Sequence, residues 1–189
     1  MLLAFHKPYV VLSQFTAEVE GQRTLAEFGF PPKVYPLGRL DADSEGLLLL
    51  SDEAGLNTKL LDPKRKHWRR YHAQVEGEAT SEALGKLGEG VMIQGKQTLP
   101  ARAWRLENQT PLPERNPPVR FRKLIPTTWI AVELTEGRNR QVRKMTAAVG
   151  LPTLRLFRVR IGQYEIPDDL RSGQWRELSA KERALVFAA

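Results

Sequence analysis

The sequence predicts an α+β fold in which short strands alternate with short helices. Strand-like segments either alternate apolar and polar residues, as in Tyr71–Val75, or are continuously apolar, as in Leu47–Ser51. Helical segments carry terminal signals, and Ser179 with Glu182 forms a capping-box pattern at the start of the last one. Strand and helix signals of this length, mixed along one chain, are typical of the α+β class.

The first third of the chain is predicted to contain four short strands and two helices. Pro8 divides the first two strand-like segments, and the apolar run that ends at Ser51 is continuous enough to be buried on both faces. Ser51 or Asp52 is placed to cap the helix that follows. The predicted strands are 2–5, 10–13, 34–37 and 47–51, and the predicted helices are 24–28 and 53–61.

The rest of the chain continues the alternation. Gly88 and Gly150 each follow a helical pattern and are expected to end it, and the Pro-rich, basic segment 111–126 is expected to be a long loop. The predicted strands are 71–75, 101–106, 129–134 and 154–161, and the predicted helices are 81–87, 140–148 and the segment after Ser179.

The chain has 189 residues, enough to bury a sizeable core, and no flexible linker separates independent domains. The segment 62–70 is the one plausible hinge. We therefore expect two approximate subdomains, 1–62 and 70–189, around one cleft.

Composition excludes several classes of function. The chain contains no cysteine, which excludes a disulfide framework, a cysteine-ligated zinc site and thiol catalysis. No apolar run approaches the roughly 20 residues that span a bilayer, and the N-terminal segment lacks the pattern of a signal peptide. We expect a cytoplasmic monomer with no membrane attachment.

Positive charge is concentrated in segments that also carry aromatic or proline residues. The net charge is +7, from 29 Lys and Arg against 22 Asp and Glu. Basic side chains cluster in 64–70 around Trp68, in 115–123 around two prolines, and in 138–160. Any one of these runs would be read as a solvated face, but three runs favour a polyanion partner. Arg and Lys would bind phosphates and the rings would stack on bases.

The segment 37–52, LGRLDADSEGLLLLSD, places an arginine and several carboxylates on a loop before an apolar run. Asp41, Asp43, Glu45 and Asp52 have the spacing of a calcium-binding loop, with glycine at its sixth position. The prolines before the loop and the four leucines after it argue against the helices that such a site requires. A polar turn with no chemical role is the remaining alternative if the loop is taken alone.

Four segments, in order along the chain, resemble the motifs of pseudouridine synthases. GRLD-x-x-S-x-GLLLL at 38–50 resembles their catalytic motif. FHKPY-x-VLS at 5–13 resembles the N-terminal KP-x-x-VL motif of the branch that modifies ribosomal RNA. RYHAQVEG at 70–77 resembles the tyrosine-bearing strand, and EGRNRQVRKM at 136–145 resembles a further motif of the same branch. The resemblance covers nearly the whole chain.

The resemblance implies a mixed, largely antiparallel sheet that spans two subdomains with a central catalytic cleft. It also implies isomerisation of a uridine to pseudouridine without metal or cofactor. Segments 98–103 and 115–129 are similar to enzymes that act on large-subunit (23S) ribosomal RNA. Many members of this branch carry an additional N-terminal S4-like domain of about sixty residues. Because the first motif here begins at Phe5, RNA capture is expected to rest on the basic segments of the catalytic domain.

By this resemblance Asp41 is the catalytic carboxylate, Tyr71 lies against the uracil ring and assists proton transfer, and Arg143 pairs with Asp41 at roughly 2.7–2.9 Å. Arg39 would help to displace the target base and Leu154 would pack below it. The other predicted RNA contacts are Arg69, Arg70, Arg120, Arg122, Arg138 and Arg140.

The expected substrate is a stem-loop of 23S ribosomal RNA with the target uridine in or near the loop, where extrusion costs least. The alternative function is a non-catalytic RNA-binding protein that uses the same basic surface. For that protein Asp41 would be dispensable, so the presence of Asp41, Tyr71 and Arg143 together favours the enzyme.

Overall fold

The computed structural model describes residues 1–62, 65, 67–107, 112, 114–119, 122 and 125–188. The chain folds into two compact units. Unit 1 consists of Met1–Arg69 and Phe157–Ala189, and unit 2 of Arg70–Leu156. The chain first passes from unit 1 to unit 2 between Arg69 and Arg70, at the end of the predicted hinge 62–70. Residues 157–189, which were expected to continue the second subdomain, belong to unit 1, where Phe157 and Arg158 pair in parallel with Glu45 and Gly46.

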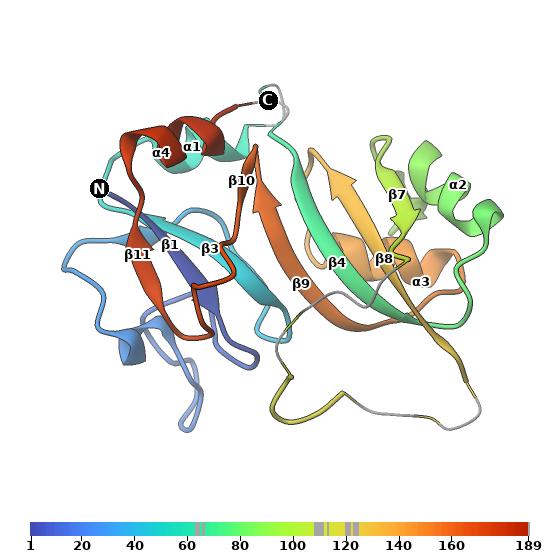
Figure 1. Ribbon diagram of the computed structural model, residues 1–189, viewed down its shortest axis with the longest axis horizontal. Helices are drawn as coiled ribbons and strands as arrows, with labels where there is room; N and C mark the ends of the chain where they lie inside the picture. The colour runs from blue at the N-terminus through green and yellow to red at the C-terminus, as the bar shows by residue number, and fades with distance from the viewer. Residues whose placement is uncertain are drawn as a thin grey trace. The chain divides into compact units, whose positions relative to one another are not determined.

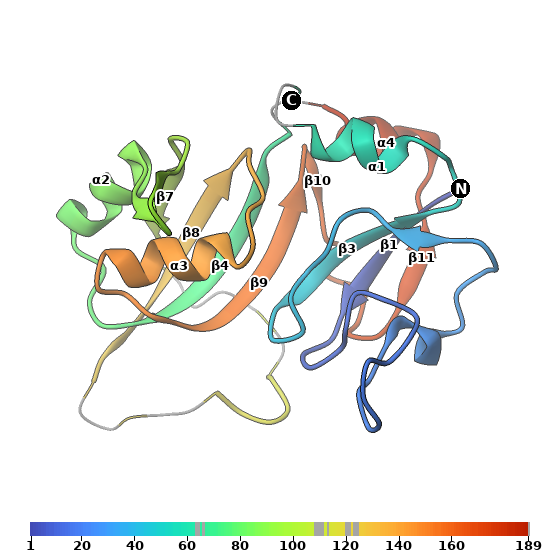
Figure 2. The same ribbon diagram turned by 180° about the vertical axis from the view of Figure 1, so that it is seen from behind.

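Unit 1 is built on a sheet with the strand order β11-β1-β3-β9 (Figure 1). Strand β1 pairs antiparallel with β11 and β3, whereas β3 pairs in parallel with β9. The short strand β2 pairs antiparallel with β3, and the short strand β10 pairs antiparallel with β9. Figures 1 and 2 both show α1 and α4 side by side at one end of this sheet. The bounds are β1 Leu2–Lys7, η1 Leu25–Phe28, β2 Tyr35–Pro36, β3 Glu45–Ser51, α1 Leu56–Leu61, β9 Thr153–Ile161, β10 Tyr164–Glu165, β11 Trp175–Glu177 and α4 Ala180–Val186.

The core of unit 1 explains the apolar runs of the sequence. Every residue of β1 and β3 is buried, as the continuous apolar run of β3 predicts for a strand covered on both faces. Leu47 and Leu49 pack in one cluster with Leu56 and Leu60 of α1 and with Val186 of α4. Burial of several such side chains, at about 1.5–3 kcal/mol each, supplies the main stabilisation of this unit.

Unit 2 contains the strand order β9-β4-β8-β7, a separate hairpin β5–β6 and the helices α2 and α3. Strand β4 alternates strictly: Tyr71, Ala73 and Val75 are buried, and the residues between them are partly exposed. Figure 2 shows α3 lying across one face of β4 and β8. The bounds are β4 Arg69–Glu76, α2 Ser81–Glu89, β5 Met92–Ile93, β6 Lys96–Gln97, β7 Arg102–Arg105, β8 Thr127–Leu134 and α3 Gln141–Ala148.

The structure confirms the α+β class and the mixed, largely antiparallel sheet, and it corrects two predicted elements. Segment 10–13 is not a strand: Val10 has a left-handed backbone (φ 62°) and only Val11 makes an isolated bridge. The helix predicted from residue 53 begins at Leu56, because Gly55 before it has φ 78° and ends the preceding turn. Within the described part of the chain, no helix combines the length and apolar character needed to cross a membrane.

Candidate active site

Asp41 lies in the loop that precedes β3 in unit 1, and hydrogen bonds fix the residues on either side of it. The Ser13 hydroxyl donates to the Leu40 carbonyl (2.6 Å) and accepts from the Leu40 N–H (3.1 Å). On the other side, the Val10 N–H donates to the Ala42 carbonyl (2.8 Å). The backbone of Asp41 is therefore held by the segment that resembles the N-terminal motif, which also explains why that segment does not extend the sheet.

Lys7 is a fully buried lysine directly beside this loop. Its ammonium group donates to the carbonyl oxygens of Pro8 (2.9 Å), Val11 (2.7 Å) and Ala42 (3.3 Å). Burial lowers the pKa of Lys7 from 10.5 to about 7, and the carboxylates of the loop, Glu45 foremost, oppose that decrease. Lys7 thus connects the two segments through hydrogen bonds and places a titratable group under the loop.

The charge of Glu45 is expected to hold the pKa of Lys7 up. Glu45→Gln keeps the shape of this buried side chain and removes its charge, so the pKa of Lys7 should fall below about 7. An NMR titration of the Lys7 side-chain carbons measures this change, with the exposed Glu18→Gln as the matched control in unit 1. A Lys7 pKa that is the same in both variants would contradict this electrostatic coupling.

Gly46 allows β3 and β9 to approach each other just after the loop. Its backbone is left-handed (φ 99°), and a Cβ there would lie 2.4 Å from the Arg158 carbonyl oxygen and 2.8 Å from the Phe157 ring. Arg158 in turn donates from Nε to the Leu47 carbonyl (2.7 Å). The glycine of the motif is therefore required by close backbone approach, and it sets where the Asp41 loop joins the sheet.

The two other predicted site residues of unit 1 differ in their surroundings. Arg39 is exposed two residues before Asp41, and its guanidinium donates to Gln14 Oε1 (3.4 Å). Arg69 is only 5% exposed and donates to the Leu60 carbonyl (3.2 Å). The RNA contact of Arg69 stays a prediction, and in the structure its guanidinium is buried and supports the end of α1.

Tyr71, Arg143 and Leu154 belong to unit 2. Tyr71 is buried on β4, and Arg143 and Leu154 are half-buried on α3 and β9. Arg143 donates from Nη1 to the Thr153 carbonyl (3.2 Å), and the Thr153 hydroxyl lies 2.7 Å from that of Thr146. Two contacts thus fix α3, and with it Arg143, against the start of β9.

The start of α3 is fixed by the buried carboxylate of Glu136. Glu136 accepts from the Leu99 N–H (2.8 Å), from Gln141 Nε2 (2.6 Å) and from Arg138 Nε (3.1 Å). The other Arg138 nitrogens donate to the carbonyls of Lys96 (3.4 Å) and Gln97 (2.7 Å). The RNA contact of Arg138 stays a prediction, and the structure shows that its guanidinium also joins Glu136 to the carbonyls of 96–97.

The remaining predicted RNA contacts in unit 2 are partly engaged in ion pairs. Arg70 donates from Nε to buried Glu133 (2.8 Å) and lies 5.4 Å from the centre of the Trp104 ring. Arg122 pairs with Glu76 at 2.7 Å. Arg140 is exposed immediately before α3, and Arg120 lies outside the described residues.

The calcium alternative for the Asp41 loop is not supported. The loop is preceded by β2 and followed by β3 rather than by two helices. Among the described residues, which include all four candidate carboxylates, no three side chains gather in a way that would hold a metal ion. The strand that follows the loop excludes the helix–loop–helix geometry of that site.

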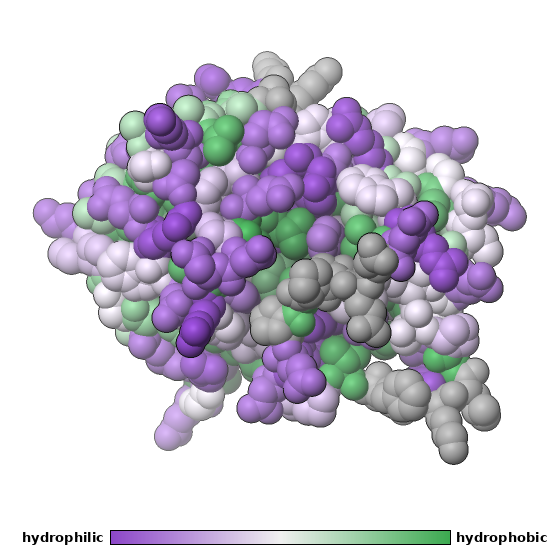
Figure 3. All heavy atoms as spheres, viewed as in Figure 1, coloured by the Kyte–Doolittle hydropathy of each residue, from purple (hydrophilic) through white to green (hydrophobic). Residues whose placement is uncertain are grey.

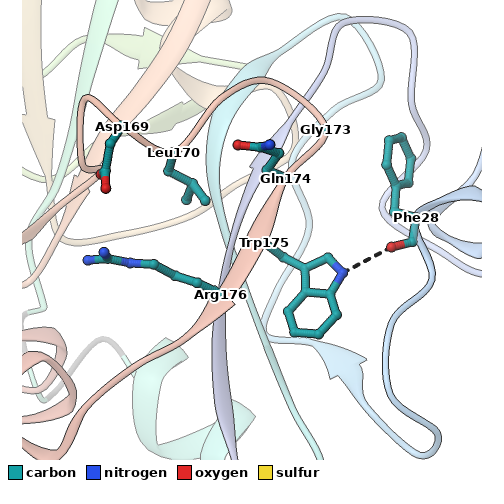
Figure 4. Close-up of a pocket in the computed structure, with 7 residues that line it drawn as sticks. All are labelled: Phe28, Asp169, Leu170, Gly173, Gln174, Trp175 and Arg176. Atoms are coloured by element: carbon teal, nitrogen blue, oxygen red, sulfur yellow. Dashed lines mark hydrogen bonds between the residues drawn. The ribbon is translucent and has the colours of Figure 1, made fainter.

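A hollow of about 480 Å³ lies beside β11 in unit 1, apart from the predicted site residues. Figure 4 shows the indole of Trp175 directed toward Phe28, to whose carbonyl it donates a hydrogen bond (2.9 Å). The Trp175 ring also stacks on Phe30 with centroids 5.8 Å apart. Hydrophilic side chains cover much of the surface over β11 in Figure 3. None of the lining residues is among those that the motifs select.

Comparison with known proteins decides the family. Residues 1–148 match the family model of RNA pseudouridylate synthases. The chain belongs to this family. It is 53% identical over 177 residues to "Ribosomal large subunit pseudouridine synthase E" of Xanthomonas campestris pv. campestris, covering 93% of this chain and 94% of that protein. The protein of the same name from Vibrio vulnificus is 49% identical over 178 residues, covering 94% of this chain and 75% of that protein.

A solved structure supports the fold of this pseudouridine synthase. "Crystal structure of pseudouridylate synthase" superimposes with a TM-score of 0.80 at 23% identity, over 98% of this chain and 73% of that chain. The predicted family, its ribosomal branch and the enzyme class are confirmed by these matches. The approach of Arg143 to Asp41, which lie in different units, stays a prediction.

Sequence reasoning missed the residues that hold the Asp41 loop. Lys7 and Ser13 both lie in the N-terminal motif. The apolar pattern predicted strands at 2–5 and 10–13, and no role was predicted for Lys7, between these strands, or for the Ser13 hydroxyl. The sequence did contain a signal, because Lys7 lies in an otherwise apolar segment. A lysine is costly to bury unless carbonyl oxygens accept hydrogen bonds from its ammonium group.

Proposed function

We propose that this pseudouridine synthase isomerises a uridine in large-subunit (23S) ribosomal RNA, with Asp41 as its catalytic carboxylate. The names of relatives at 53% and 49% identity support the substrate class. The observation that carries the catalytic assignment is the rigid presentation of Asp41, whose two neighbours in sequence are bonded to the N-terminal motif. Hydrogen bonds on both sides of Asp41 restrict where its side chain can lie, and this positioning supports a catalytic role.

The reaction rearranges one nucleotide and consumes nothing else. The N1–C1′ bond breaks, the base turns, and a C5–C1′ bond forms, while a proton leaves C5 and one is gained at N1. Asp41 acts at C1′ or elsewhere on the sugar, Tyr71 lies against the ring and assists proton transfer, and Arg143 keeps the carboxylate ionised. Arg39, exposed beside the loop, displaces the target base, and Leu154 packs below it.

Mapping pseudouridine in ribosomal RNA tests the substrate. The purified protein is incubated with unmodified 23S transcript, and carbodiimide labelling followed by primer extension locates each pseudouridine. We expect one modified uridine in or near a stem-loop, and loss of the same modification in a strain that lacks the protein. Small-subunit ribosomal RNA serves as the control transcript. Modification of that control alone would contradict the proposed substrate.

The loop 111–126 is expected to contribute to RNA binding. Its Arg122 is tied to Glu76 at the end of β4 (2.7 Å), while Arg120 and Lys123 lie outside the described residues. Replacing Arg120, Arg122 and Lys123 with Ala should reduce turnover at limiting RNA and lower the salt slope by about 0.7–0.9 for each lost phosphate contact.

Activity on a folded 23S fragment and thermal melting together check this expectation, with the exposed Lys181→Ala of α4 as the control. The melting temperature should change little. Undiminished activity of the triple variant at limiting RNA would instead indicate that the loop is a connector without an RNA contact.

A further inference from the structure

Among the described residues of unit 2, two that are not glycine have a left-handed backbone. Gln94 has φ 49° and Arg140 has φ 52°. Gln94 and Gly95 (φ 74°) form the two-residue turn of the hairpin β5–β6, with positive φ at both positions. Such turns favour Asn, Asp or Gly at the first position. A long side chain at a position where glycine would be less strained suggests that the side chain itself has a function.

The two strained residues lie on one surface, because polar contacts join the hairpin to the start of α3. Lys144 donates from Nζ to Gln94 Oε1 (2.8 Å) and to Asn139 Oδ1 (3.1 Å). Its backbone N–H donates to the Arg140 carbonyl (3.0 Å). Arg138, which precedes α3, also connects to the hairpin, because it donates to the carbonyls of both residues of β6.

This surface is basic and amide-rich. We call this surface the hairpin patch; it consists of Gln94, Lys96, Asn139, Arg140 and Lys144. The patch carries three positive charges, from two lysines and one arginine. Its hydrogen-bond donors are two primary amides, one guanidinium and two ammonium groups. All but the half-buried Lys144 are exposed. The buried carboxylate of Glu136 forms an ion pair with Arg138 (3.1 Å), which offsets its charge, and Arg138 is not counted in the patch.

We propose that the hairpin patch binds the phosphodiester backbone of the RNA substrate outside the nucleotide that is isomerised. Cationic side chains and amide N–H groups are the donors that phosphate oxygens receive in protein–RNA complexes, and they position the RNA without reading its sequence. This proposal rests on the proposed function, from which the RNA bound by the patch is taken. It adds a contact made by β5–β6, an element that none of the family-like motifs contains.

Binding measurements on two variants test the patch. Lys96→Ala removes one charge, and Arg140→Gly removes one charge while relieving the left-handed strain. Fluorescence anisotropy with a labelled 23S stem-loop fragment should show that each variant binds about five- to eightfold more weakly at 0.1 M salt. The slope of log affinity against log salt should fall by about 0.7–0.9, as for one lost phosphate contact. Arg140→Gly should melt at the same or a higher temperature.

The matched control is Lys86→Ala, an exposed lysine on α2 that pairs with Glu82 outside the patch; its affinity should equal that of the unchanged protein. The proposal is overturned if Lys96→Ala and Arg140→Gly bind like this control, or if affinity falls with no change in salt slope. If the unchanged protein binds the fragment but never isomerises it, the proposed function fails while weaker binding by both variants still supports the patch.

Discussion

Asp41→Asn is expected to abolish pseudouridine formation while leaving RNA affinity close to that of the unchanged protein. The substitution keeps the size of the side chain and its ability to bond within the loop, and it removes the ionisable carboxylate. Loss of an acid or base alone costs about 10²–10⁴-fold, and the carboxylate is proposed to act at the sugar as well. Turnover should therefore fall by at least about 10³-fold.

Release of tritium from C5 of uridine in a labelled RNA measures this turnover, because the new C–C bond forms at that carbon. Anisotropy on the same RNA measures affinity. Asp43→Asn is the matched control: Asp43 is half-buried in the same loop two residues later, and no chemical role is proposed for it. Turnover by the Asp41→Asn variant at the unchanged rate would end the catalytic assignment. Equal loss in both variants would indicate a general requirement for the charge of the loop.

The order of the motifs predicts the family, and period-two patterns predict the principal strands. Strand β4 alternates between buried and partly exposed residues as its sequence predicts, and β3 is buried throughout. These patterns can be recognised in the sequence because each buried position of a strand favours an apolar residue, so the order of apolar and polar residues follows burial. The short strands β5, β6, β10 and β11, of two or three residues each, are too short to show a period, and tertiary pairing alone defines them.

The site was less predictable than the fold because side-chain partners are not local in sequence. The charge pattern predicts RNA contacts for Arg69 and Arg138 and does not predict their internal partners. Arg69 donates to a backbone carbonyl, and Arg138 donates to two backbone carbonyls and to Glu136. Lys7 looks like a surface lysine, but it is buried among carbonyls of two separate segments. In each case the deciding contact depends on tertiary packing, which a charge pattern does not contain.

Lys7→Met is expected to impair turnover by about tenfold or more while the protein remains folded. The variant leaves the carbonyls of Pro8 and Val11 without this donor, at about 1–3 kcal/mol each. It also removes the cost of burying an ammonium group, about 4–5 kcal/mol for a pKa lowered from 10.5 to about 7. These effects nearly offset each other, so stability should change by about 2 kcal/mol or less. The lost bond to Ala42 loosens the Asp41 loop.

The pH dependence of stability separates this role from ordinary packing. The unfolded chain binds the Lys7 proton between pH of about 7 and 10.5 while the folded protein does not, so this group makes the free energy of unfolding rise with pH across that window. Denaturant titrations should show that rise in the unchanged protein and a flatter profile in Lys7→Met, with exposed Lys181→Met as control. Turnover should fall through kcat rather than KM, because the fully buried Lys7 positions the loop and is not accessible to RNA. An unchanged kcat would show that the loop keeps its geometry without Lys7.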